Sequence, residues 1–177
     1  IMNITPISPS IGAIISGIDL AEGINVEEAS KIRNIWLRHK VVVFRGQKLN
    51  PNRQIQVAKA FGEPVRYPFL KGLDGHPEIT PILKKETETV NFGGIWHSDT
   101  TYQPCPPMAT MLYALELPPV GGDTLFANQV QAYESLSDGL KNTLAKLNII
   151  SRPDKAAAMA TRADRIAEQG RDTSKDN

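Results

Sequence analysis

A histidine and an aspartate separated by one residue mark the middle of the chain, in the stretch from Trp96 to Tyr102, which reads W-H-S-D-T-T-Y. Side chains of an extended backbone alternate between two faces, so His97 and Asp99 would lie on the same side of a strand. An imidazole nitrogen and a carboxylate oxygen are two of the three ligands that bind non-heme Fe(II). The pattern therefore predicts a metal-binding strand, although zinc would also suit these ligands. A solvent-facing pair or a hydrogen-bonded histidine are the structural alternatives.

Local patterns predict strands that alternate with helices. Asn25 and Glu28 form a capping-box pattern before a helix whose apolar side would contain Val26, Ala29, Ile32, Ile35 and Trp36. Asn50 and Pro51 predict a second helix that ends near Phe61. Helical structure is expected over residues 129–147, with a break near Ser137. Strands are expected at residues 4–7, 12–20, 41–44, 78–84, 96–102, 108–117 and 123–127.

Further motifs accompany the H-x-D stretch in a fixed order. Downstream lie the apolar segment 106–118 and then Gly121-Gly122-Asp123-Thr124. Upstream are three more segments, at residues 11–20, 37–45 and 61–64. With these motifs in register, residues 4–150 resemble the family of taurine dioxygenase and 2,4-dichlorophenoxyacetate dioxygenase (TauD/TfdA), whose members depend on Fe(II) and 2-oxoglutarate.

The resemblance implies the fold and the division of the chain. The residues alone indicate only mixed helices and strands. The resemblance implies an α+β or mostly β fold, namely a double-stranded β-helix, or jelly roll, with flanking helices. We expect the jelly-roll core to occupy residues 1–150 and to be incomplete at its C-terminal end. Residues 151–177 have many charges and few large apolar groups, which predicts a mobile lid or linker. A second mobile flap is expected at residues 85–94, which include Gly93 and Gly94.

The resemblance also implies roles for individual residues. His97 and Asp99 would bind the metal, and no catalytic residue is expected beyond these ligands. The hydroxyl of Thr124 would bind a carboxylate of 2-oxoglutarate, unless Thr124 is an ordinary strand residue. Three residues fall at substrate-side or lid positions of the family, although each could equally serve packing: Tyr67, Thr100 and Tyr102.

One departure from the family concerns the third metal ligand. Family members continue past the position of Asn177, and their later part supplies a distal histidine and an arginine that pairs with 2-oxoglutarate. The other histidines here, His39 and His76, both precede the motif. We therefore expect a piece of a longer protein, without the third ligand and not a complete catalyst. A non-catalytic jelly-roll binding or assembly module is the alternative if the chain ends at Asn177, and a zinc hydrolase ranks third because no general base is recognisable.

The reaction that the resemblance implies is hydroxylation of a small organic anion by O2, with release of succinate and CO2. The substrate class would be a sulfonate, a sulfate ester or an aryloxyalkanoate-like acid. Taurine is disfavoured, because Gly93 and Leu70 align with positions where taurine dioxygenases carry polar groups.

Composition excludes several partners. A net charge of +1 gives no electrostatic reason to expect nucleic acid or acidic lipid. No apolar run approaches the roughly 20 residues of a membrane span. The single cysteine, Cys105, cannot form an internal disulfide, which favours a reducing compartment such as the cytoplasm. A homo-oligomer is compatible with the sequence.

Overall fold

The computed structural model describes residues 2–89 and 93–152 of the 177-residue chain. They divide into two compact units, one made of Ile1–Gly62 and Leu112–Asn148, the other of Glu63–Met111 and Ile149–Asn177. Every helix and strand of the described residues belongs to the first unit. The two segments expected to be mobile lie in part outside the described residues, at 90–92 and 153–177.

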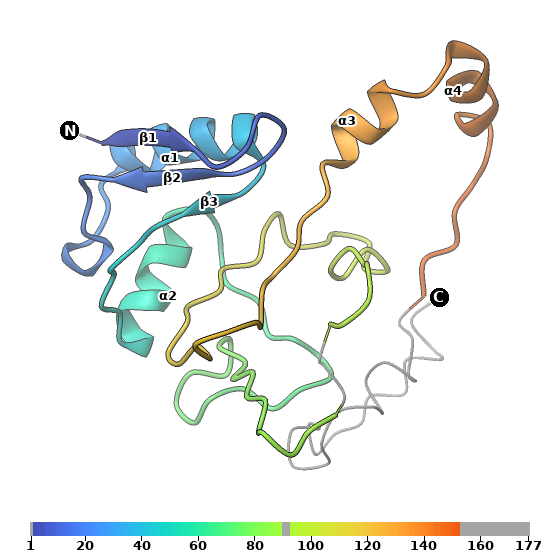
Figure 1. The fold of residues 1–177 in the computed structure, drawn as a ribbon. Coiled ribbons are helices and arrows are strands. Elements are labelled where there is room, and N and C mark those ends of the chain that lie inside the picture. The colour runs from blue at the N-terminus through green and yellow to red at the C-terminus, as the bar shows by residue number, and fades with distance from the viewer. Residues whose placement is uncertain (1, 90–92, 153–177) are drawn as a thin grey trace. The chain divides into compact units, whose positions relative to one another are not determined.

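A small sheet organises the first unit. Strands β1 (Asn3–Pro6) and β2 (Ala13–Ser16) pair antiparallel, and β2 pairs in parallel with β3 (Val42–Val43). The parallel pairing is possible because helix α1 (Val26–His39) connects β2 to β3 (Figure 1). These strands lie within or beside the segments predicted at 4–7, 12–20 and 41–44, but each is shorter than expected or shifted by a residue.

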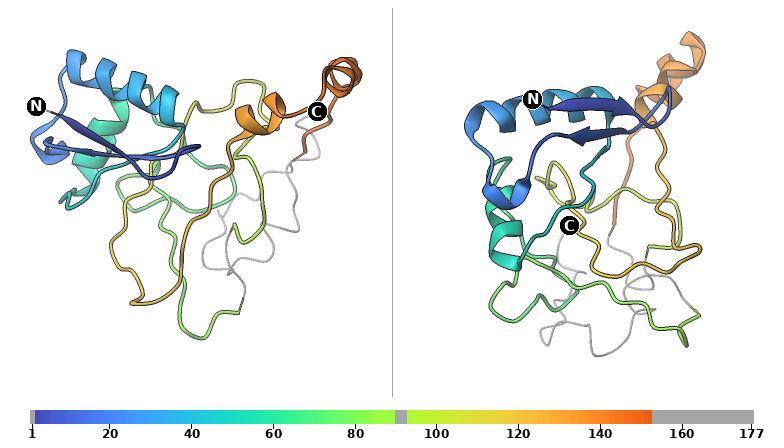
Figure 2. Two further views of the ribbon diagram at one scale, coloured as in Figure 1. Left: turned by 45° about the horizontal axis from the view of Figure 1, so that its top comes forward. Right: turned by 60° about the vertical axis from the view of Figure 1, so that its left-hand side comes forward.

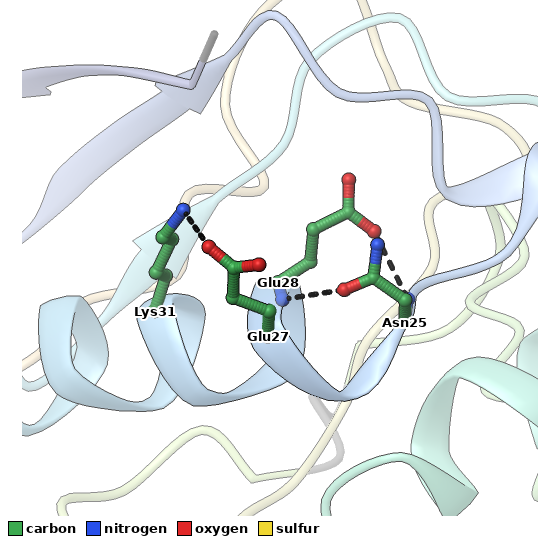
Figure 3. Close-up of polar contacts among 4 residues, drawn as sticks. All are labelled: Asn25, Glu27, Glu28 and Lys31. Carbon is green, nitrogen blue, oxygen red and sulfur yellow. Dashed lines mark hydrogen bonds and ion pairs between the residues drawn. The ribbon is translucent and has the colours of Figure 1, made fainter.

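The start of α1 is formed by two reciprocal hydrogen bonds (Figure 3). The side-chain oxygen of Asn25 accepts a hydrogen bond of 2.9 Å from the amide of Glu28. The Glu28 carboxylate accepts one of 2.9 Å from the amide of Asn25. This confirms the predicted capping box, in which two amides that the helix cannot satisfy find side-chain partners.

One face of α1 packs on the sheet and forms the core of the first unit (Figures 1 and 2). The buried side chains of the sheet and α1 are Ala13, Ile15, Ala29 and Ile32. Val26, predicted on the apolar side of the helix, does not contribute to this core, since it is 88% exposed. Val26 is the first residue of the helix.

Three further α-helices and a short 3-10 helix, η1 (Leu20–Glu22), complete the described elements. Asn50 caps helix α2 (Pro51–Lys59), as predicted, and its Val57 is buried. The predicted helical stretch 129–147 forms two helices, α3 (Gln129–Glu134) and α4 (Asp138–Leu144). The break occurs where predicted, because Ser137 caps α4 by accepting a hydrogen bond from Leu140.

The strands predicted at residues 78–84, 96–102, 108–117 and 123–127 are not formed. A strand requires a neighbouring strand that completes its hydrogen-bond ladder, and these segments have none among the described residues. Their apolar side chains stay open to solvent, with Leu115 89% and Leu125 71% exposed. The described residues thus show an α+β arrangement with one three-stranded sheet, and not the paired sheets of a complete jelly roll.

Candidate metal and cosubstrate site

His97 and Asp99 lie together in the second unit, with Nε2 of His97 3.2 Å from Oδ1 of Asp99. The expected strand around them is replaced by a turn over residues 99–102. Thr100 has a left-handed φ of 50°, and its carbonyl accepts a hydrogen bond from the amide of Gln103. The two side chains therefore meet beside a reversal of the chain and not on one face of a pleated strand.

The imidazole of His97 is oriented by its own backbone surroundings. Nδ1 of His97 lies 2.7 Å from the carbonyl oxygen of Ile95. A carbonyl can only accept a hydrogen bond, so the proton of the neutral ring resides on Nδ1. Nε2 is then left with a lone pair, and it is this atom that faces Asp99. Ligating histidines use the same arrangement, with one nitrogen donating to a carbonyl and the other bound to a metal.

A cation suits the position between these two atoms. Nε2 of the neutral ring and Oδ1 of Asp99 are both acceptors, so their approach to 3.2 Å is favourable only if a proton or a metal ion lies between them. Ligand atoms about 2.1 Å from a metal and at right angles to each other lie about 3.0 Å apart. The side chains are 47% and 55% exposed, which leaves room for a metal ion and further ligands.

The donor set therefore fits two positions of the facial triad that binds Fe(II). Within residues 2–89 and 93–152, no third histidine, cysteine, aspartate or glutamate joins this pair to make a complete metal-binding group. His39, the last residue of α1, belongs to the first unit.

The second oxygen of Asp99 has a partner that the sequence did not reveal. Oγ1 of Thr110 donates a hydrogen bond of 2.7 Å to Oδ2 of Asp99. The two residues are eleven positions apart, and Thr110 lies in a segment predicted as an ordinary strand. No local sequence signal connects them.

Gly93 lies against the His97 ring. It has a φ of 71°, and a methyl group added there would come within 3.3 Å of Cε1 of His97. Glycine is the residue that adopts this backbone conformation without strain and also leaves space for the ring.

Aromatic side chains lie near the ligand pair in the same unit. The ring of Phe69 lies between two tyrosines, with centroids 5.6 Å from Tyr67 and 6.0 Å from Tyr102. Burial raises the pKa of the Tyr67 phenol above its ordinary value, and the negative charge of Asp99 adds to the rise. Tyr67 is thus close enough to Asp99 to respond to its charge, and Tyr102 is connected to it through Phe69. Phe69 was not among the residues that the sequence predicted for the site, although it lies only two residues from Tyr67, which was.

The remaining predicted residues, Thr100 and Thr124, belong to different units. Thr100 is partly buried within the turn itself. Thr124 belongs to the first unit, where it is exposed and lies outside the helices and strands. Trp96, which precedes His97 in the sequence, is 70% exposed.

No helix within residues 2–89 and 93–152 combines the length and apolar character that crossing a membrane requires.

The chain matches one protein family over almost its whole length. Residues 3–175 match the model of the family described as "Taurine catabolism dioxygenase TauD, TfdA family". An alpha-ketoglutarate-dependent sulfate ester dioxygenase of Pseudomonas putida is 33% identical over 147 residues, which cover 82% of this chain and 48% of that protein. An alpha-ketoglutarate-dependent 2,4-dichlorophenoxyacetate dioxygenase of Cupriavidus pinatubonensis is 31% identical, with coverage of 80% and 55%.

A solved structure gives the same relationship in three dimensions. The crystal structure of a putative alpha-ketoglutarate-dependent taurine dioxygenase from Burkholderia xenovorans superposes with a TM-score of 0.70 at 34% sequence identity. The match covers 82% of this chain and 51% of that one. The chain thus spans about half the length of the relatives that it matches.

Proposed function

The chain belongs to the TauD, TfdA family of taurine catabolism dioxygenases, and from this premise we propose that the whole protein is an Fe(II)- and 2-oxoglutarate-dependent dioxygenase. The observation that best supports this activity is the pair of acceptor atoms, Nε2 of His97 and Oδ1 of Asp99, 3.2 Å apart. Relatives that match the chain are named as enzymes, which favours this proposal over a non-catalytic binding module.

In this proposal His97 and Asp99 hold Fe(II), together with a third ligand that is not among the described residues. The iron and bound 2-oxoglutarate would supply the chemistry that activates O2, releases succinate and CO2, and hydroxylates the substrate. The chain's own contribution is to bind and orient. His97 presents Nε2 because the Ile95 carbonyl holds the proton on Nδ1, and Asp99 presents Oδ1 while its other oxygen is hydrogen-bonded.

By family resemblance, the Thr124 hydroxyl donates a hydrogen bond to a carboxylate of 2-oxoglutarate. We assign the substrate to the class of small organic anions, namely sulfonates, sulfate esters and aryloxyalkanoate-like acids. The matching relatives named for a sulfate ester and for 2,4-dichlorophenoxyacetate support this class.

Tyr67, Thr100 and Tyr102 are proposed to contact the substrate. The electrostatic effect of Asp99 on Tyr67 and the ring contact between Phe69 and Tyr102 support an aromatic lining beside the ligand pair. Burial and charge both favour the neutral phenol of Tyr67, so its hydroxyl can donate a hydrogen bond to an anion.

For the whole protein we further propose a complete double-stranded β-helix with outer helices. Its core would include residues 1–150, and residues 151–177 would form a lid or linker. A cytoplasmic location and a homo-oligomer belong to the same proposal, and the exposed single Cys105 suits a reducing compartment.

The test uses protein expressed from its complete coding sequence. It is incubated with Fe(II), 2-oxoglutarate, O2 and, in turn, an alkyl sulfate ester, an alkylsulfonate and an aryloxyalkanoate, and succinate is measured by mass spectrometry. We expect succinate formation to rise with at least one anion, and to be lost in His97→Ala. Succinate no higher than in the metal-free control, across the whole panel, would refute the proposed activity.

A further inference from the structure

We propose that Thr110 is a positioning residue for the metal site, which holds the Asp99 carboxylate so that Oδ1 alone is directed toward the metal. The inference rests on the proposed Fe(II)-dependent function. It adds a residue that lies outside the H-x-D motif and that does not itself bind metal.

The hydrogen bond has only one possible direction. An ionised carboxylate has no proton to donate, so the 2.7 Å contact between Oγ1 of Thr110 and Oδ2 of Asp99 is donated by threonine. Such charge-assisted bonds are stronger than bonds between neutral groups. The bond therefore engages one carboxylate oxygen and leaves the other, Oδ1, 3.2 Å from His97.

Asp99 needs this restraint because more than half of its side chain is open to solvent. Its side chain is 55% exposed and stands in a turn, so packing does not hold the plane of the carboxylate. A carboxylate that rotates freely can present either oxygen or both to a metal. Ordering it in advance removes a conformational cost from metal binding.

Both ligands are then restrained in the same way. The Ile95 carbonyl holds Nδ1 of His97, and Thr110 holds Oδ2 of Asp99. In each case the partner occupies one polar atom and leaves the other facing the position between the two side chains. Outer contacts of this kind change metal affinity by about 10–100-fold when they are removed.

The test measures Co(II) binding by calorimetry, without O2, in protein expressed from its complete coding sequence. Thr110→Val removes the hydroxyl at nearly constant shape, and Thr110→Ser restores it. Thr101→Val is the matched control. The hydroxyl of Thr101 lies in the turn that contains Asp99, but it bonds Ser151 at 2.9 Å. Thermal unfolding without metal shows whether each variant folds, and Thr110→Ala replaces Thr110→Val if the valine variant does not.

We expect Thr110→Val to weaken Co(II) affinity about 10–100-fold, with Thr110→Ser and Thr101→Val close to the unmodified protein. The unfolding temperature of metal-free Thr110→Val should change little. A purely structural role for Thr110 would instead lower this temperature and leave metal affinity unchanged. Unchanged Co(II) affinity in Thr110→Val or Thr110→Ala, or equal loss in Thr110→Ser, would overturn the inference. Failure of the unmodified protein to bind Co(II) would instead count against the proposed function.

Discussion

The carboxylate of Asp99 raises the pKa of the Tyr67 phenol, as a smaller contribution beside that of burial. Two residues separated by more than thirty positions thus share one electrostatic environment, which joins the aromatic group to the proposed metal ligand. Their coupling can be measured without substrate and without activity.

We predict that Tyr67 ionises at higher pH than an ordinary tyrosine. The neutral phenol is favoured in the folded state, so its contribution to stability is present below a pH of about 10 and is lost as pH rises through the raised native pKa. NMR of tyrosine labelled with carbon-13, in metal-free protein, follows the titration, and Tyr67→Phe assigns the signal. Asp99→Asn should lower the Tyr67 pKa only in part, because burial remains. No change in Asp99→Asn would contradict the coupling.

His97→Ala should abolish binding of Co(II) or Fe(II). Losing one of the three proposed protein ligands leaves too few contacts to compete with water and buffer for the metal. His39→Gln is the matched control, since it replaces a histidine at the end of α1 and should leave metal binding unchanged. Calorimetric titration distinguishes the variants. Stoichiometric binding by His97→Ala would remove His97 from the site.

Local signals account for the parts of the fold that the sequence predicted well. The capping box of Asn25 and Glu28 lies within four residues, and Ser137 caps α4 within three residues of its partner Leu140. Such contacts are settled by neighbouring residues, so a sequence pattern can identify them. The same holds for Asn50 and Pro51 at the start of α2.

Contacts between distant residues account for most of what the sequence did not predict. An apolar, β-branched segment favours a strand, but pairing depends on a partner that the segment does not specify, and residues 108–117 have none among those described. The turn after Asp99 was missed because threonine rarely adopts the left-handed φ seen at Thr100. The sequence predicted that His97 and Asp99 lie together, but from the alternation of side chains on a strand, whereas the structure has a turn there. Thr110 bonds Asp99 from eleven positions away, and no sequence pattern indicates that contact.

Gly93→Ala should both destabilise the protein and weaken its metal affinity. The left-handed φ of 71° costs a residue with a side chain about 1–2 kcal/mol, and the added methyl group would lie 3.3 Å from Cε1 of His97. Gly75→Ala separates the two effects, because Gly75 has a φ of 79° in the same unit but no atom within 4 Å of the added group. Both variants should lose stability in urea denaturation, and only Gly93→Ala should lose Co(II) affinity. Equal metal affinity in the two would show that the ring tolerates the methyl group.

The capping box should contribute more to stability than the neighbouring ion pair. Asn25→Ala removes a side-chain cap and should cost about 1 kcal/mol in the free energy of unfolding. The ion pair of Glu27 with Lys31 has side chains 77% and 58% exposed, so solvent screens it and Lys31→Gln should cost less than Asn25→Ala (Figure 3). Asn25→Ser, which retains a capping oxygen, should restore most of the loss. Urea denaturation measures all three variants, and a larger cost for Lys31→Gln than for Asn25→Ala would contradict this ranking.

Phe69 should influence binding of the organic substrate and not binding of the metal. Its ring contacts Tyr67 edge-on and Tyr102 at a tilted angle, so Phe69→Ala removes two aromatic contacts that hold the tyrosines in place. Each such contact contributes about 0.5–1.5 kcal/mol, which predicts a rise in KM for the anion of about 5-fold or more. Phe69→Tyr keeps the ring and should preserve KM. Co(II) affinity should be unchanged in both variants, because a phenylalanine side chain has no atom that can bind the metal or hydrogen-bond His97 or Asp99. A Phe69→Ala protein with unchanged KM for every anion that it oxidises would show that the three rings serve packing, and Tyr67 and Tyr102 would then lose their proposed role toward the substrate.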